Sequence, residues 1–136
     1  MQDTEDQKIK ALAMNHQEYK MQAEAIKQQM DMIQASIEDC TNALESIDEL
    51  LNVGTNAELM IPIGAGIQIY AKPESIEKIV VPIGSGISVE KTPSDAKDSI
   101  NNRKEELLKA FGQMGDTLQK LVNAIKEIEA ESASMQ

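Results

Sequence analysis

The sequence predicts an α+β fold in which two long helices form an antiparallel coiled coil and two β-hairpins lie between them. Apolar residues recur every three or four positions near both ends of the chain, and a stretch rich in Ile and Val is repeated in the middle. The 136 residues include no Trp, two Tyr and one Phe, which is too few aromatic side chains for an ordinary globular core. We expect one domain over residues 1–136.

The formal net charge of −10 is unevenly distributed along the chain. Residues 1–52 carry four basic and eleven acidic side chains, a balance of −7. A surface of this sign repels phosphate groups, so neither nucleic acid nor an anionic membrane is expected as a partner. The acidic face is compatible with a basic partner and equally with no partner but water.

Cysteine usage and hydropathy indicate the cellular setting. The single cysteine, Cys40, cannot form a disulfide within the chain, and the N-terminal residues MQDTEDQKIK are too polar for the core of a secretory signal. No stretch approaches the roughly 20 apolar residues that span a bilayer. We therefore expect a cytoplasmic location and no membrane segment.

The first long helix is expected over residues 5–52. Its heptad seam is formed by residues at alternating spacings of three and four: Ile9, Leu12, His16, Tyr19, Ala23, Ile26, Met30, Ile33, Ile37, Cys40, Leu44, Ile47 and Leu51. No Pro or Gly precedes Gly54, so nothing in this segment interrupts the helix.

The second long helix is expected over residues 93–132. Thr92 suits the N-cap position, Pro93 the first helical position and Asp95 the acidic third position. Its seam consists of Ile100, Lys104, Leu107, Phe111, Met114, Leu118, Leu121, Ile125 and Ile128, in which only Lys104 is charged. Gly112 and Gly115 each cost about 1 kcal/mol relative to Ala inside a helix, so this region should be softer than its surroundings. Two such helices bury their seams most simply by folding back on each other.

The middle segment, residues 53–91, contains an internal repeat. The residues MIPIGAGIQI at 60–69 return as VVPIGSGISV at 80–89. Each copy predicts two strands folded at its glycines, so the four strands are expected near 57–63, 66–71, 76–83 and 86–91. A proline in each copy indicates an edge strand or a bulge, because proline cannot donate to the sheet ladder.

Isolated hairpins are marginally stable in water, and one chain offers no third layer to cover these. We therefore predict that the hairpins pair with those of other subunits. The residues expected to form this assembly surface are Ile61, Pro62, Ile63, Gly64, Gly66, Ile67, Ile69, Val81, Pro82, Ile83, Gly84, Gly86, Ile87 and Val89.

No residue pattern in the sequence predicts catalysis, a cofactor or a metal. The glycines of the repeat complete neither GxGxxG nor GxxxxGK[ST], so a phosphate-binding loop is not expected. The only histidine, His16, and the only cysteine, Cys40, both fall in the first seam, where packing explains them better than chemistry. The carboxylates are scattered over helix faces. We expect no enzyme.

The doubled ΦΦPIGxGIxΦ pattern at 60–69 and 80–89 between two heptad helices resembles the alpha-type subunit of the prefoldin family. The resemblance covers nearly the whole chain. It implies a hexamer of two alpha and four beta subunits, whose hairpins form a β-barrel platform from which the coiled coils project. It also implies that non-native proteins are bound at the coiled-coil tips without ATP and passed to a group II chaperonin.

The expected client-binding tip combines the start of the first helix with the end of the second. Its candidate residues are Ile9, Leu12, Met14, Met21, Leu121, Val122, Ile125 and Ile128. Methionine adapts to irregular apolar partners, but scattered apolar side chains also occur on ordinary surfaces. Two alternatives stay open at this point: a tethering coiled-coil scaffold that docks one fixed folded partner, and an accessory subunit of an enzyme.

Overall fold

The structure is a computed structural model that describes residues 2–135, and the chain divides into two compact units. The tip unit comprises residues up to 36 together with those from 107 onward, and the hairpin unit comprises residues 37–106. Helices α1 (Gln2–Val53) and α2 (Pro93–Ser134) each contribute to both units. Two antiparallel hairpins lie between the helices, so the predicted fold class is confirmed. That the chain behaves as a single domain stays a prediction.

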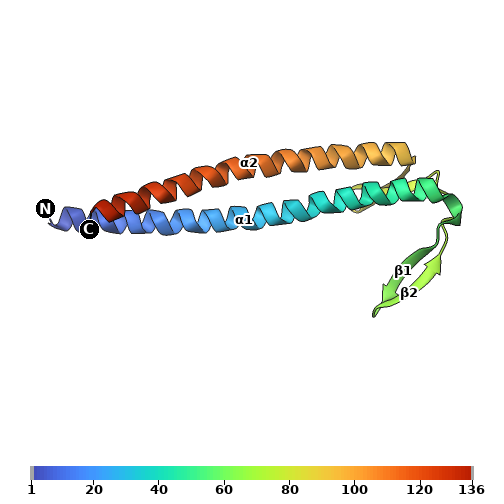
Figure 1. Ribbon diagram of the computed structural model, residues 1–136, viewed down its shortest axis with the longest axis horizontal. Helices are drawn as coiled ribbons and strands as arrows, with labels where there is room; N and C mark the ends of the chain where they lie inside the picture. Colours follow the sequence, from blue (N-terminus) through green and yellow to red (C-terminus); the bar gives the residue numbers. More distant parts are fainter. Residues whose placement is uncertain (1, 136) are drawn as a thin grey trace. The chain divides into compact units, whose positions relative to one another are not determined.

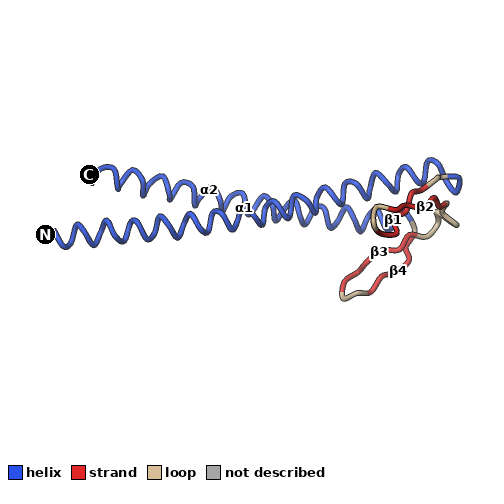
Figure 2. Tube along the Cα trace, turned by 90° about the horizontal axis from the view of Figure 1, so that it is seen from below, coloured by secondary structure: helices blue, strands red, loops and turns tan. Residues whose placement is uncertain are grey.

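In the tip unit, the two helices lie side by side in opposite directions, and the start of α1 and the end of α2 are at the same end (Figures 1 and 2). The seam predicted for α1 is buried or half-buried here at every position except Ile9, which is 43% exposed. The α2 seam is half-buried throughout this unit. Burial at a spacing of three and four residues is the packing of an antiparallel coiled coil.

The glycines of α2 do not interrupt the helix, which is continuous from Pro93 to Ser134. A Cβ atom placed on Gly112 would meet nothing within 4 Å, while one on Gly115 would lie 3.8 Å from the Cε atom of Met30. Both positions therefore accept a methyl group without a clash. The cost of these glycines is one of backbone entropy, with no compensating close packing at Gly112.

We predict that Gly112→Ala raises the free energy of unfolding by about 1 kcal/mol, because alanine restricts the unfolded chain and fits the folded helix. Thermal unfolding followed by circular dichroism measures the change. The matched control is Gln113→Ala at the next exposed position, where helix propensities differ by less. An unchanged or lower stability of Gly112→Ala would show that this glycine has a packing role.

In the hairpin unit, the predicted start of α2 is confirmed in atomic detail. The backbone N–H of Asp95 donates to Oγ1 of Thr92 at 3.2 Å, and that of Ala96 donates to the carbonyl of Thr92 at 2.9 Å. Thr92 is therefore the N-cap, with Pro93 at the first helical position. One turn later, Nζ of Lys97 lies 2.6 Å from Oδ1 of Asp48 and links the two helices.

The first hairpin pairs β1 (Leu59–Gly64) with β2 (Ile67–Ala71), and the second pairs β3 (Ile79–Gly84) with β4 (Ile87–Lys91). The strands begin one to three residues later than predicted. Before β1, a short 3-10 turn at Gly54–Asn56 is closed by a hydrogen bond from Ala57 N–H to the Gly54 carbonyl at 3.1 Å.

The two hairpins turn in the same way. Positive φ angles at Ala65 and Gly66, and again at Ser85 and Gly86, identify two-residue turns of type I′, whose twist matches that of antiparallel strands. The strand register shifts between the proline and the first glycine of each copy, at Pro62/Gly64 and Pro82/Gly84. The bulge expected from the prolines is thus present in both hairpins.

The hairpin unit has one buried core cluster, built from Ile47 of α1, Val81 of β3 and Ala96 of α2, with Ile79 and Ile100 packed against it. The second hairpin is therefore anchored on the helices of its own chain. The expectation that one chain offers no cover for its hairpins is wrong for Val81, which is 9% exposed. It holds for the first hairpin, whose equivalent residue, Ile61, is 42% exposed.

Candidate functional site

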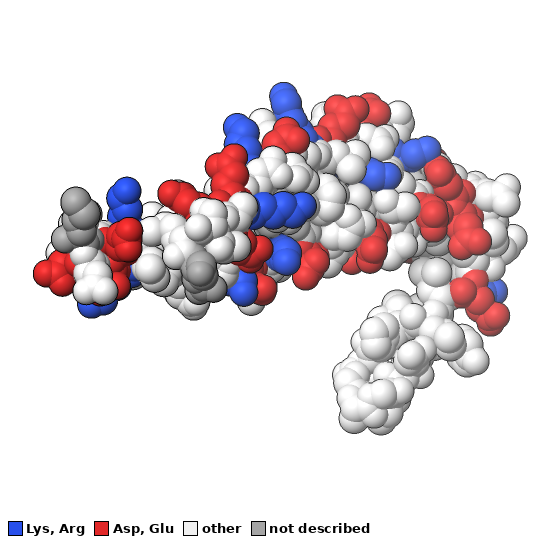
Figure 3. Space-filling view, turned by 60° about the vertical axis from the view of Figure 1, so that its left-hand side comes forward, with Lys and Arg blue, Asp and Glu red and all other residues white. Residues whose placement is uncertain are grey.

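The first hairpin presents an uncovered aliphatic face. Because side chains alternate between the two faces of a strand, the cross-strand pair Ile61 and Ile69 shares a face with Ile63 and Ile67. All four side chains are between 42% and 60% exposed. No charged residue lies between Leu59 and Ala71, and Figure 3 shows this hairpin as a protrusion free of acidic and basic side chains.

The second hairpin presents a smaller part of the corresponding face. Ile83 and Ile87, next to the turn, are exposed, whereas Val89 is half-buried and Val81 belongs to the core cluster. The remaining residues of the predicted assembly surface are all exposed and form the bulges and turns: Pro62, Gly64, Gly66, Pro82, Gly84 and Gly86. The predicted surface thus lies on four strands, and the end of each hairpin near the turn is open to solvent.

The structure places the predicted tip residues in the tip unit, on both helices. Ile9, Met14 and Met21 of α1 are exposed. The other five are half-buried: Leu12, Leu121, Val122, Ile125 and Ile128. Since α1 and α2 are antiparallel, residues far apart in sequence share this end of the unit.

A polar pair joins the helices within this tip. The imidazole Nε2–H of His16 donates to Oε1 of Glu129 at 3.0 Å, across 113 residues of sequence. Leu12 lies one turn before His16, and Ile125 and Ile128 lie within one turn before Glu129. The pair therefore indicates which turns of α1 and α2 lie opposite each other at this end of the tip unit. His16 has the role of a half-buried seam residue, as its position in the heptad predicted.

The family model described as "Prefoldin subunit" matches residues 19–136. A prefoldin subunit alpha of Methanosarcina mazei is 41% identical over 133 residues, which cover 96% of this chain and 94% of the relative. The chain belongs to the prefoldin family.

Two solved prefoldin structures share the fold. A filamentous prefoldin of Methanocaldococcus jannaschii, solved by cryo-EM, superposes with a TM-score of 0.75 at 24% identity and covers 88% of this chain and 98% of its own. The crystal structure of a prefoldin beta subunit from Thermococcus strain KS-1 gives a TM-score of 0.64 at 18% identity and covers 93% and 90%. The resemblance to the prefoldin alpha subunit inferred from the doubled repeat is confirmed.

Membership of the prefoldin family gives this chain a chaperone subunit role. The side chains that could carry such a role are apolar and exposed, and they include residues of the hairpins and of the tip. Sequence reasoning missed other exposed apolar side chains. Among these are Met32, 71% exposed on α1, and the pair Met60 and Tyr70 on the back of the first hairpin. Helical periodicity could have predicted the exposure of Met32, because Met14 and Met32 are five turns apart and therefore lie on the same face of α1.

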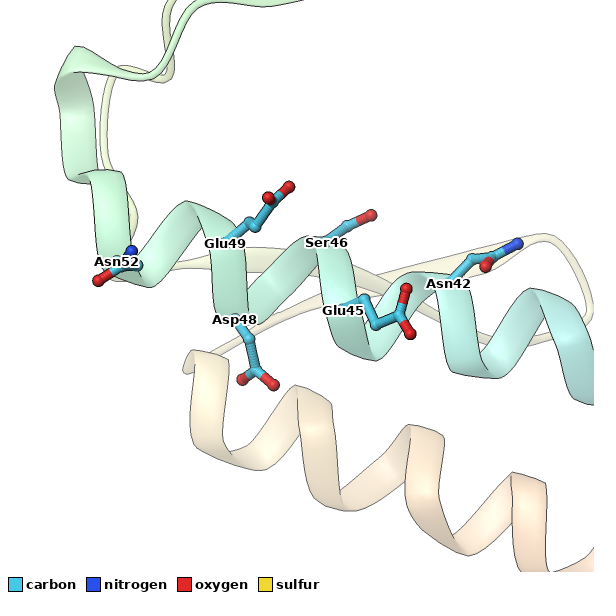
Figure 4. A pocket seen from close by; sticks show the side chains of 6 residues that line it. All are labelled: Asn42, Glu45, Ser46, Asp48, Glu49 and Asn52. Atoms are coloured by element: carbon cyan, nitrogen blue, oxygen red, sulfur yellow. The ribbon is translucent and has the colours of Figure 1, made fainter.

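The prefoldin chain also has a polar hollow beside the end of α1, of about 700 Å³ (Figure 4). It is lined by Asn42, Glu45, Ser46, Asp48, Glu49 and Asn52. The residues that the structure describes contain no group of three or more His, Cys, Asp or Glu that could hold a metal ion. Neither helix, within residues 2–135, has a stretch long and apolar enough to cross a membrane.

Proposed function

We propose that this chain is a subunit of an ATP-independent holdase: it assembles through its hairpins with beta-type prefoldin subunits and binds non-native proteins at the coiled-coil tip. The observation that carries the proposal is the exposed aliphatic face of the hairpins, together with the exposed Met14 and Met21 near the tip, in a chain of the prefoldin family. The assembly is two alpha with four beta subunits, in which the hairpins form a β-barrel platform.

Assembly through the hairpins is supported by the exposure of the aliphatic faces. Burying one Ile side chain fully contributes on the order of 2 kcal/mol, and each chain offers at least six exposed or half-exposed aliphatic side chains on these faces. A closed barrel also removes the free strand edges of β1 to β4, which otherwise pair at random with other chains. Assembly and protection from aggregation therefore favour the same arrangement.

Client binding at the tip is supported by the chemistry of Met14 and Met21, which are 68% and 64% exposed. Thioether side chains are flexible and polarisable, so they pack against apolar segments of many shapes. Each contact is weak, but several tips in one assembly bind a single unfolded chain simultaneously and raise the overall affinity by orders of magnitude. Such binding needs no ATP and selects for exposed apolar segments.

The client is then passed to a group II chaperonin, and the complex is cytoplasmic. Both parts of the proposal rest on the family and on the composition of the chain, with its acidic surface and single cysteine.

We predict that Met14→Glu with Met21→Glu lowers the suppression of aggregation severalfold, because two carboxylates replace apolar contacts at each tip. The measurement is light scattering from a denatured model protein diluted into buffer with the reconstituted complex and no ATP. The matched control is Met32→Glu with Leu108→Glu, which changes two exposed apolar residues of the tip unit outside the predicted tip.

A truncation lacking residues 1–21 and 122–136 serves as the limiting case and should abolish suppression. If the intact complex gave no suppression, the holdase proposal would fail, and a scaffold that docks one fixed folded partner would become the leading account. If the Met14/Met21 variant and the Met32/Leu108 control lost activity equally, the binding surface would not be the tip. Stable copurification with a catalytic subunit would instead favour an enzyme accessory role.

A further inference from the structure

Helix α1 carries a second row of apolar side chains, outside the seam that packs against α2. Its largest members are Met14, Met21 and Met32, which are 68%, 64% and 71% exposed. Three exposed alanines each lie three or four residues from one of these methionines: Ala11, Ala25 and Ala35. These six residues are called the methionine row, and all of them belong to the tip unit.

The methionine row has the spacing of a face that binds another helix. Residues three and four apart are neighbours on a helix surface, and every alanine of the row stands in that relation to a methionine. Met14 is about two turns from Met21 and five turns from Met32, so the three share one face. From residue 11 to residue 35 the row is about 36 Å long, at 1.5 Å per residue. A helix lying along it would stay in contact for about seven turns.

Acidic side chains accompany the methionine row. Glu18 lies between Met14 and Met21, four residues after the first and three before the second. Glu24 follows Met21 by three residues, and Asp31 lies two turns beyond Glu24. Among the described residues, none of these three carboxylates takes part in an ion pair. They are therefore free to meet the basic side chains of a partner.

The two lysines of this stretch lie on the other side of the helix. Lys20 and Lys27 follow the seam residues His16 and Ala23 by four residues, so they flank the contact with α2. The surrounding charge has the same sign as the carboxylates of the row, since residues 1–52 carry a balance of −7. The potential over the methionine row is therefore negative.

We propose that the methionine row binds a basic amphipathic helix of a partner protein, with the apolar face of that helix on the methionines and its Lys or Arg side chains beside Glu18 and Glu24. Methionine side chains adapt to apolar surfaces of different shape. Amphipathic helices bind such surfaces through apolar residues at helical spacing. Alanines between the methionines let the two helix axes approach closely, because they add little bulk to the contact.

Charge excludes a second copy of this chain as the occupant. The same row on a second copy would bring its own Glu18, Glu24 and Asp31 against the first set. Facing carboxylates repel each other, and juxtaposed like charges suppress a wrong partner. A basic helix turns the same carboxylates into favourable contacts at the edge of the interface.

The helix is a different ligand from the unfolded chains that the proposed function assigns to the tip. The methionine row shares Met14 and Met21 with the predicted tip, but Met32 is eleven residues, or about 16 Å, beyond Met21. An unfolded chain presents short apolar segments, whereas a helix makes use of the whole row. Met32→Glu should therefore weaken the binding of a helix and leave the suppression of aggregation unchanged. The inference does not rest on the holdase proposal.

The first arm of the test is fluorescence anisotropy of a labelled probe peptide with the complex reconstituted from this chain and a beta-type prefoldin subunit. The probe is a synthetic helix of about 25 residues, the length of the row, with Leu at the two apolar positions of each heptad and Lys at the two flanking positions. One control peptide has the same residues in scrambled order, and another has Glu in place of Lys. The basic helix should bind at least about tenfold more tightly than either control.

Substitutions in this chain locate the site. Met32→Glu should raise the Kd of the basic helix about tenfold, and Met32→Leu should leave it unchanged. The matched control is Leu108→Glu, which adds the same charge in place of an exposed apolar residue of α2 and should have no effect. Glu18→Gln with Glu24→Gln should raise the Kd severalfold and make it less dependent on salt, because two charges are removed from the contact.

The second arm does not depend on a charged variant. A photoreactive p-benzoylphenylalanine replaces Met32 in the reconstituted complex, and cross-links to the basic helix are expected. The same group in place of Leu108 should give none.

Four results would overturn the inference: equal binding of the scrambled peptide, equal binding of the acidic peptide, an unchanged Kd for Met32→Glu, or cross-links from position 108 as abundant as those from position 32. Failure of the holdase proposal is recognised separately, because it is measured by light scattering with an unfolded protein. That result neither requires nor prevents the binding of a helix to the methionine row.

Discussion

The double variant Ile67→Asp with Ile87→Asp is expected to remove hairpin-mediated assembly, both for the chain alone and for its complex with beta-type subunits. Ile67 and Ile87 begin β2 and β4 and are 58% and 56% exposed in the single chain. In the proposed platform each would point into the barrel. Placing a carboxylate there costs several kcal/mol for each hairpin, more than the aliphatic contact it replaces contributes.

Native mass spectrometry measures this effect as the loss of every species larger than one chain. The matched control is Ala65→Asp with Ser85→Asp, which adds the same two charges at the hairpin turns. Both positions have a left-handed backbone, with φ of 52° and 54°, a conformation that Asp adopts more readily than most residues. An unchanged mass for Ile67→Asp with Ile87→Asp would contradict assembly through these faces.

The second large effect is expected from Val81→Asp, which should destabilise the hairpin unit by about 3 kcal/mol or more. Val81 is packed among Ile47, Ala96 and Ile100, and Ala96 is fully buried. A carboxylate at this position has no hydrogen-bond donor among those apolar neighbours, so its desolvation is uncompensated. The second hairpin would lose its attachment to the two helices, while the helices could still pair through their seams.

Chemical denaturation followed by circular dichroism reports the overall loss, and hydrogen exchange of the β3 and β4 amides reports whether the hairpin detaches. Val80→Asp is the control, because Val80 is the preceding residue on the opposite face and is 66% exposed. Equal effects of the two substitutions would mean that strand propensity, and not burial against Ile47 and Ala96, determines the stability of this hairpin.

The helices and the hairpins could be predicted from sequence because their signals are local. Each heptad seam repeats over many turns, so one exception such as Lys104 does not obscure it. The N-cap at Thr92 is specified by four consecutive residues, and the turns at Gly66 and Gly86 by the conformations that glycine permits. Because the sequence pattern is repeated, the prediction of the first hairpin also predicts the second.

The packing of the second hairpin could not be predicted in this way. Ile61 and Val81 occupy the same place in the repeat, yet one is exposed and the other buried. The difference comes from Ile47 and Ala96, which lie on two different helices. A local sequence pattern does not show which residues that are distant in the chain lie close together in the fold. For the same reason, the sequence suggested that neither hairpin had cover within its chain.

The role of the candidate site residues stays a prediction, whereas their exposure can be compared with the structure. Helical phase distinguishes seam residues from the outward-facing Met14 and Met21, so exposure could be anticipated. It does not distinguish Met14 from Met32, because both lie on one face and their roles depend on where a client binds. That Met60 and Tyr70 form an exposed pair could not be predicted without the strand register, which places these two residues opposite each other.

The pairings along the two helices also have a consequence for the order of events during synthesis. Lys97 meets Asp48 across 49 residues, and Glu129 meets His16 across 113. The turns of both hairpins close over a few residues and can form early, but the second hairpin gains its core only when Ala96 of α2 has been made. Each later turn of α2 then extends a helix pair that already exists, and the ends proposed to bind clients are the last to be joined. On the proposed function, synthesis therefore completes the residues of the assembly surface before those of the client-binding end.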